Sequence, residues 1–226
     1  MSAPKTHWFR RMVLNGLLIC GFLSSLLYLA MNVIVPMLFE GYSLASQTVS
    51  ELSAIDAPTR PLWVLLGTGY SVLVAAFGWG VWKSAGGNRP LRVVGALMLF
   101  DGIVSLYWPP MHLRGAGFSM TDKMHIIWAA VTVFLMTLAI GFGAAAFGKR
   151  FRFYSIATLV ILVVFGALTG MESPRIAANL PTPWIGVWER TSIAAFMLWV
   201  LVLAMILLAD QSSAAAHGPS RRSGAK

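Results

Sequence analysis

The stretch from Met12 to Phe39, MVLNGLLICGFLSSLLYLAMNVIVPMLF, contains no charged residue and no alternation of apolar and polar positions. At ~1.5 Å per residue, a helix of this length exceeds the ~30 Å hydrocarbon core of a bilayer. Only helices and closed barrels satisfy their backbone hydrogen bonds in lipid, and a barrel strand would alternate. We therefore interpret this stretch as a membrane-spanning helix.

Five further apolar segments follow the first one, and the third and fifth of the six are only just long enough to cross. They are Leu62 to Trp82, Leu91 to Trp108, Met124 to Phe147, Phe153 to Gly170 and Gly186 to Ala209. The chain is 58% hydrophobic and 11% charged, whereas soluble domains carry about 25% charged residues. The sequence predicts an all-α fold, a polytopic membrane bundle of six transmembrane helices.

The distribution of lysine and arginine predicts the orientation of these helices. Twelve of them fall on one side, namely Lys5, Arg10, Arg11, Lys83, Arg89, Arg92, Lys149, Arg150, Arg152, Arg221, Arg222 and Lys226. Five fall on the other side, namely Arg60, Arg114, Lys123, Arg175 and Arg190. Cytoplasmic loops carry the excess, so both termini are expected in the cytoplasm. The net charge of +9 is then a topology signal and an attraction to membrane lipids, not a nucleic-acid footprint.

The same pattern divides the chain into three parts. Residues 1–11 form a basic cytoplasmic N-terminus, residues 12–209 the transmembrane domain, and residues 210–226 a basic cytoplasmic tail that is expected to be disordered. Small residues in the fourth and fifth helices, at Gly141 to Gly148 and Gly166 to Gly170, permit close helix contacts. Packing inside the bundle is the favoured interpretation, and a homo-oligomer contact is the alternative.

The non-cytoplasmic connections are the longer ones, and six of the eight acidic residues lie at that face. Loops held by a rigid scaffold often carry function, so we expect a site there. Asp101 is the most costly residue nearby, because it lies within the third apolar segment, roughly 10 Å below the boundary. Asn32, Thr68 or Tyr70, and Thr132 could share its polar layer. Asp101 is a candidate buried acid, and a structural carboxyl that only fixes packing is the alternative.

Two histidines, His112 and His125, come after the double proline that follows the third segment. Asp122 and His125 are three residues apart, so they are neighbours on one helical face. A carboxylate beside an imidazole suits a general base or a metal ligand, although Asp122 also fits a helix N-terminus capped by Ser119 or Thr121. His112 and Arg114 are candidate substrate-binding residues in the loop. His112 and His125 are the candidate metal ligands, and the sequence identifies no metal or other cofactor.

Two further pairs complete the candidate site. Glu189 and Arg190 are adjacent in the sixth helix and point about 100° apart, so each needs another partner. Arg190 could reach Asp101 or an anionic ligand, and Glu189 could reach His125 or Arg114. Ser50 and Glu51 are candidate binding residues, but the spacing of Thr48 and Glu51 is that of a capping box on a short helix running to about Ile55.

Four motifs together resemble a known family. They are SELSA after the first segment, an aspartate followed by WPPMH, TDKMH at the start of the fourth segment and the G-x-x-E-R of the sixth. This combination resembles domain-of-unknown-function family 998, which comprises small bacterial membrane proteins with six expected helices. The resemblance implies a six-helix fold and a bacterial inner membrane, but no established activity. It adds weight to the residues that carry it, which are Ser50, Glu51, Asp101, His112, His125, Glu189 and Arg190.

Three functions remain open at this point, and the sequence does not decide whether the protein is an enzyme. The leading hypothesis is a polar pocket facing the outer leaflet that binds, and could process, a lipid or other amphiphile. In it, His125, Asp101 and Glu189 are the candidate catalytic residues. Arg190 and Arg114 hold anionic groups, and Asp122 or Glu189 orients His125. The alternatives are a proton- or cation-coupled carrier that uses Asp101, and a non-catalytic assembly or accessory protein.

Overall fold

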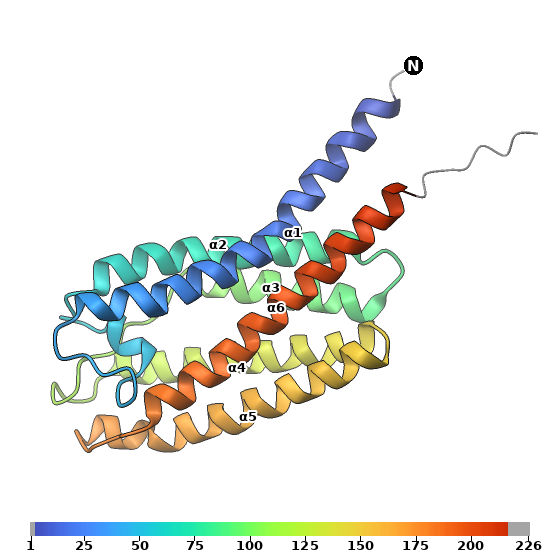
Figure 1. Ribbon diagram of the computed structural model, residues 1–226. Coiled ribbons are helices and arrows are strands. Elements are labelled where there is room, and N and C mark those ends of the chain that lie inside the picture. The colour runs from blue at the N-terminus through green and yellow to red at the C-terminus, as the bar shows by residue number, and fades with distance from the viewer. Residues whose placement is uncertain (1–2, 217–226) are drawn as a thin grey trace, which may run out of the picture.

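The computed structural model describes residues 3–216, with side chains placed from Trp8 to Ser213. Those residues form six α-helices and two short 3-10 helices (Figure 1). The α-helices are α1 (Ala3–Ile34), α2 (Arg60–Ser84), α3 (Arg89–Val104), α4 (Met120–Ala146), α5 (Lys149–Ala177) and α6 (Ile185–Ala216). The 3-10 helices η1 (Val35–Leu38) and η2 (Val49–Ser53) both lie between α1 and α2. The all-helical fold is thus confirmed.

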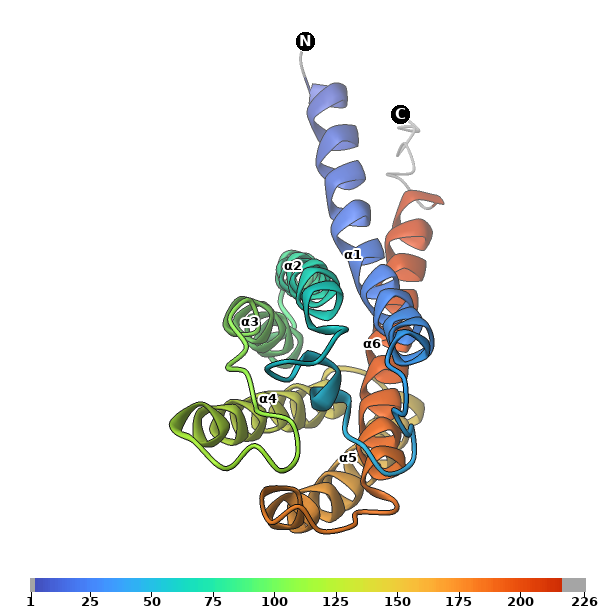
Figure 2. The ribbon, with the colours of Figure 1, turned by 90° about the vertical axis from the view of Figure 1, so that its left-hand side faces the viewer.

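The helices pack in sequence order, and α1 packs against α6, so that the six form a ring (Figure 2). The long connections, residues 35–59, 105–119 and 178–184, gather at one end, which we call the loop end. The start of α1, the end of α6 and the short connections at 85–88 and 147–148 lie at the opposite end, which we call the terminal end. Both ends of the described chain therefore lie on one side of the bundle.

Five of the helices are long and apolar enough to cross a membrane. The exception is α3, which has 16 residues and spans about 24 Å. It ends at Val104, not at Trp108 as predicted. Pro109 lacks the N–H that a longer helix would direct to the Ser105 carbonyl, and the Ser71 hydroxyl donates to that carbonyl instead, at 3.1 Å. The chain thus leaves the helix one turn before the double proline.

Glycines bring α2 and α3 into close contact. A Cβ atom on Gly78 would stand 2.2 Å from the backbone nitrogen of Leu99, and one on Gly102 would stand 2.4 Å from that of Ala75. Both positions therefore need a residue without a side chain. The contact also sets the level of Asp101, because its neighbour Gly102 lies against Ala75, fifteen residues after the start of α2. Asp101 therefore lies level with a point about 22 Å along α2 from the loop end. This depth is greater than the distance from Asp101 to the end of α3 suggests.

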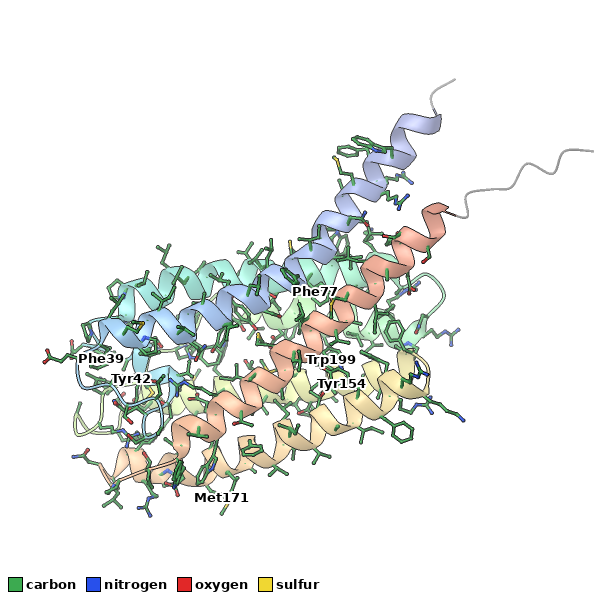
Figure 3. The ribbon with its side chains drawn as sticks, in the orientation of Figure 1. Phe39, Tyr42, Phe77, Tyr154, Met171 and Trp199 are labelled. Atoms are coloured by element: carbon green, nitrogen blue, oxygen red, sulfur yellow. The ribbon has the colours of Figure 1, made fainter. Side chains whose placement is uncertain are left out.

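Large apolar side chains fill the half of the ring nearer the terminal end. Phe77, Phe196 and Trp199 are fully buried, and Phe77 and Trp199 lie among the central side chains in Figure 3. The Trp199 indole donates to the Ser155 hydroxyl at 3.0 Å, which satisfies its polar atom. This cluster is the main hydrophobic core, and a second, smaller one at the loop end contains Met31, Val35, Val49, Leu52 and Trp63.

The small residues of α4 and α5 behave differently from each other. In α4, a Cβ on Gly143 would stand 2.4 Å from the Trp199 ring, so this glycine packs inside the bundle as predicted. In α5, nothing lies within 4 Å of the Cβ positions of Gly166 and Gly170. The favoured prediction of internal packing is therefore wrong for this pair.

The two terminal segments are more helical than the sequence suggested. α1 begins at Ala3 and so includes most of the basic N-terminus of residues 1–11. α6 continues to Ala216, six residues past the predicted beginning of the tail. The Arg11 guanidinium donates to the Gln211 carbonyl at 3.0 Å, which joins the two helices. The rest of the tail expected to be disordered, residues 217–226, lies outside the described residues.

Candidate functional site

Glu51 is the centre of a buried polar cluster at the loop end. Its side chain is fully buried and accepts the Thr48 backbone N–H at 2.7 Å, which completes the capping box predicted for this segment. Arg114, from the connection between α3 and α4, meets it with two nitrogens. Nε lies 2.7 Å from Oε1 and Nη2 lies 3.1 Å from Oε2. This two-point pairing suits guanidinium and carboxylate, and it ties two loops together.

The remaining donors of Arg114 also have partners in the protein. Nη1 donates to the Thr182 hydroxyl at 2.7 Å, and Nη2 donates to the Ser46 carbonyl at 2.8 Å. Thr182 precedes α6, so Arg114 joins all three long connections of the loop end. Ser50 lies in η2, where its carbonyl accepts from the Ser53 hydroxyl at 3.0 Å. Arg114 and Glu51 are thus engaged with each other and not directed to a ligand.

The two charged residues of α6 hold the first connection from the other side. The Glu189 carboxylate accepts the Val49 backbone N–H. The sequence had suggested His125 or Arg114 as its partner, and its contact is with neither of them. Arg190 Nη1 donates to the carbonyls of Leu44 at 2.9 Å and Gln47 at 3.0 Å. Adjacent positions on a helix point in different directions, so the pair contacts separate parts of one loop. Neither Asp101 nor an open pocket receives the Arg190 guanidinium.

Tyr42 extends this contact. Its hydroxyl accepts from Arg190 Nη2 at 2.6 Å and donates to the Thr48 carbonyl at 2.6 Å (Tyr42 is labelled in Figure 3). Burial raises the pKa of the Tyr42 phenol to about 12, despite the nearby Arg190 guanidinium, which lowers it. The phenol is therefore neutral at physiological pH and keeps its donor. Gly186 allows the approach, because a Cβ there would stand 2.3 Å from the carbonyl oxygens of Leu44 and Gln47.

His112 and Asp122 form a second hydrogen-bonded pair at the loop end. The Asp122 carboxylate accepts the His112 backbone N–H at 2.7 Å and lies 2.9 Å from ring Nδ1. The same carboxylate accepts the Ser119 backbone N–H at 2.8 Å, which makes the capping box of α4. Ser119 is the cap, one of the two residues that the sequence offered. Asp122 thus orients His112, whereas the sequence had it orient His125.

His125 lies one turn further into α4 and is 6% exposed. Its Nδ1 lies 2.7 Å from the Pro109 carbonyl, so Nδ1 carries the hydrogen, because a carbonyl can only accept. The Trp108 ring meets the imidazole edge-on with 5.6 Å between centroids. These contacts hold the double-proline segment against α4. No described hydrogen bond joins the ring to Asp122, and Nε2 remains as its second nitrogen.

Asp101 differs from all of these residues. It is 4% exposed, and its Oδ1 atom is buried without a hydrogen-bond partner among the residues that the structure places. Thr132, on α4, is 7% exposed, and its hydroxyl likewise has no described partner. The Trp128 indole donates to the Val104 carbonyl at 3.2 Å. One turn below that bond, Asp101 and Thr132 lie at the same depth on adjacent helices, so the predicted polar layer includes both.

Tyrosines continue from this layer toward the loop end. The Tyr70 phenol, on α2, lies within electrostatic range of the Asp101 carboxyl. The Tyr70 and Tyr28 rings are 4.8 Å apart between centroids, and Tyr28 is within electrostatic range of Glu189. Asn32, one turn from Tyr28, has a buried Oδ1 without a partner in the described chain. The two phenol rings thus contact each other, and no described hydrogen bond joins them to Asp101 or Glu189.

The candidate metal ligands do not come together. Among the described residues, no three histidine, cysteine, aspartate or glutamate side chains form a group that could hold a metal ion. His112 contacts Asp122, and His125 contacts the Pro109 carbonyl. The sequence also missed Tyr42, Gln47 and Thr182, because their partners are backbone groups and loop side chains that no motif spacing indicates.

The fold and the polar layer define a multi-pass helical membrane protein. The chain belongs to the family described as protein of unknown function DUF998, whose model matches residues 22–206. That confirms the family that the sequence motifs resemble, and the matched region includes every candidate residue named above. No curated protein and no solved structure matches this chain significantly.

Proposed function

We propose that this protein is a proton- or cation-coupled carrier in which Asp101 binds and releases the coupling ion. In this proposal the six helices all cross the bacterial inner membrane, and both termini are cytoplasmic, as the lysine and arginine distribution favours. The loop end then faces outward. The supporting observation is that the Asp101 Oδ1 atom is buried and has no hydrogen-bond partner in the described part of the chain.

The physical argument is one of cost. A carboxylate in the middle of a membrane helix costs ~2.5–3.5 kcal/mol on insertion scales, and such residues usually belong to ion or proton pathways. A carboxyl kept for packing would have its oxygens satisfied, because a buried oxygen without a partner costs about 1–3 kcal/mol more. Asp101 and the Thr132 hydroxyl offer oxygen atoms at one depth, and a proton or small cation would satisfy them.

A route from Asp101 toward the loop end supports the same proposal. Tyr70 and Tyr28 lie between Asp101 and Glu189, and hydroxyl groups can both accept and donate hydrogen bonds. Glu189 contacts the Val49 backbone of the first connection, so the route reaches the loop that covers this end. Proton relays in membrane proteins consist of such series of polar side chains.

The lipid-pocket hypothesis has less support. The groups that would bind an anionic lipid, Arg114 and Arg190, donate to carboxylate, hydroxyl and carbonyl oxygens of the protein itself. An amphiphile would have to displace these contacts before it could bind. His125 donates to the Pro109 carbonyl, so a general-base role would rest on its other nitrogen alone.

The test is ion flux in liposomes that contain the purified protein and an internal dye for pH, Na⁺ or K⁺. We expect a potential-driven flux of at least one of these ions that Asp101→Asn abolishes and Asp101→Glu retains in part. Asp56→Asn is the matched control, because Asp56 is an exposed carboxylate at φ 68°, a conformation that asparagine tolerates. Wild-type flux equal to that of empty liposomes for all three ions, or flux that persists in Asp101→Asn, would overturn the proposal.

A further inference from the structure

A groove of about 480 Å³ runs along α3 at the terminal end, away from the residues discussed so far. Arg89 and Arg92 lie at its mouth, in the first turn of α3, and Trp82 of α2 forms one wall. The rest of the lining consists of Val93, Ala96, Leu97 and Phe100. The volume is within the ~300–1,000 Å³ range of small-molecule sites.

The lining residues of α3 form one face of that helix. Counted from Arg89, they fall at i+3, i+4, i+7, i+8 and i+11, which is the spacing of a single helical stripe. The stripe is basic at the helix start and apolar for about 12 Å beyond Arg92. Phe100, at its far end, is 54% exposed. The groove is thus open along its length, with charge at one end and apolar walls pointing toward the middle of the membrane.

The two arginines are available to a ligand. Both are exposed. Arg92 donates to the Gly86 carbonyl, which leaves further donors of its guanidinium, and no described contact engages Arg89. Guanidinium groups bind phosphate with two parallel hydrogen bonds. Basic pockets between membrane helices on the cytoplasmic side are known to hold anionic lipid head groups.

We infer that this groove binds an anionic glycerophospholipid, with its phosphate at Arg89 and Arg92 and one acyl chain along Val93, Ala96 and Phe100. Charge complementarity favours a lipid over a second copy of this chain. All eight acidic residues of the sequence lie in the described part of the chain. Asp210 alone among them is near the terminal end, so another copy would bring mostly positive charge to the groove.

The site is independent of the carrier proposal. It lies on the side of α3 that faces the membrane, whereas Asp101 is 4% exposed, and a lipid there requires no ion movement. A lipid bound there would cover the α2–α3 pair near the short connection between the two helices. Binding of the lipid and ion flux can therefore fail separately.

The test is native mass spectrometry of the protein in mild detergent with phosphatidylglycerol or phosphatidylcholine of identical acyl chains. We expect wild-type protein to retain phosphatidylglycerol preferentially. Arg89→Gln with Arg92→Gln should weaken that retention by about 30-fold, the equivalent of about 1 kcal/mol for each arginine. The matched control is Arg150→Gln with Arg152→Gln, two exposed arginines in the first turn of α5, of which Arg152 also donates to a backbone carbonyl.

A second variant separates the groove from its charge. Ala96→Phe fills the apolar channel and leaves both arginines in place, so retention of phosphatidylglycerol should fall by roughly 10-fold. If the control pair loses as much lipid as the groove pair, the attraction is general surface charge and the inference is wrong. Unchanged retention in a folded Ala96→Phe protein would equally overturn it. Should Ala96→Phe not fold, the exposed arginine pair and its control still decide the matter.

Discussion

Most buried polar groups of the loop end have hydrogen-bond partners, with Arg190 Nε and Glu172 Oε2 as exceptions, whereas Asp101 Oδ1 and the Thr132 hydroxyl have none in the described chain. At the loop end, Glu51 and Arg114 are paired, and the Asp122 carboxylate makes four hydrogen bonds, two with His112 and two with Ser119. Around Asp101, one turn below the Trp128–Val104 bond, carboxyl and hydroxyl oxygens are buried without described partners. Satisfied networks rigidify a structure, whereas unsatisfied buried groups are expensive and indicate another role. The first region therefore holds the connections together, and the second is the basis of the proposed ion site.

The largest effect is expected at the Glu51–Arg114 pair. Glu51→Gln leaves the Arg114 guanidinium in a buried place without its carboxylate, which should lower the free energy of unfolding by about 3–5 kcal/mol. Thermal unfolding in detergent measures the change. Glu172→Gln is the control, because Glu172 and the exposed Arg175 form a partly exposed pair at 3.3 Å whose loss should cost under about 1 kcal/mol. Equal losses in the two variants would contradict the distinction between a buried and a partly exposed pair.

A smaller loss is expected at Arg190. Arg190→Lys keeps the charge but cannot reach Leu44, Gln47 and Tyr42 together, so the unfolding free energy should fall by about 2 kcal/mol. Limited proteolysis of the 35–59 connection reports the release of the loop. Arg175→Lys, at an exposed position, serves as the control. Resistance to proteolysis equal to wild type would show that Arg190 does not hold this loop.

Tyr42 gives a prediction with a pH dependence. Tyr42→Phe removes two hydrogen bonds and should cost about 1 kcal/mol at neutral pH. Because the folded pKa of Tyr42 is raised to about 12 from an ordinary value near 10, its contribution is fully present below pH ~10. That contribution is lost as the pH rises through about 12. The stability difference between wild type and Tyr42→Phe should therefore shrink over this range, and a constant difference would argue against it.

The smallest effect on stability is expected at Asp101. Asp101→Asn removes the cost of a buried carboxyl without a change of shape, so the unfolding free energy should change by less than about 1 kcal/mol or rise. The same unfolding assay as for Glu51→Gln measures it, which makes the comparison direct. A loss as large as that of Glu51→Gln would mean that Asp101 is a structural residue, and the two regions would then not differ in kind.

Local sequence patterns predicted a large part of this structure. The apolar lengths predicted the helices, because the distance across a bilayer and the rise of a helix are both constant. The spacing of Thr48 and Glu51 predicted the capping box, and Ser119 was among the predicted caps of α4, since both features form within a few residues of chain. Asp101 was recognisable as well, because a carboxylate in an apolar run is costly wherever its helix packs.

The partners of the charged residues could not be predicted in this way. Glu51 meets Arg114 across 63 positions, and Arg190 meets the Leu44 carbonyl across 146. Such contacts depend on which helices are neighbours and how the long connections fold over them. Local sequence patterns also could not predict that α3 ends at Val104, because the Ser71 hydroxyl of another helix replaces the missing proline N–H.

The amino-acid sequence by itself determined the membrane class, the family and the residues at which polarity is costly, because hydropathy and local hydrogen bonding act over short distances along the chain. Only the tertiary structure decided that the arginines of the loop end are engaged within the protein and that the Asp101 oxygen is not. Whether a buried polar group is satisfied depends on atoms brought close by the packing of distant segments. Asp101 and Glu51 are both buried acids in the structure, but Glu51 pairs with Arg114 across two connections, whereas Asp101 Oδ1 has no partner among the described residues.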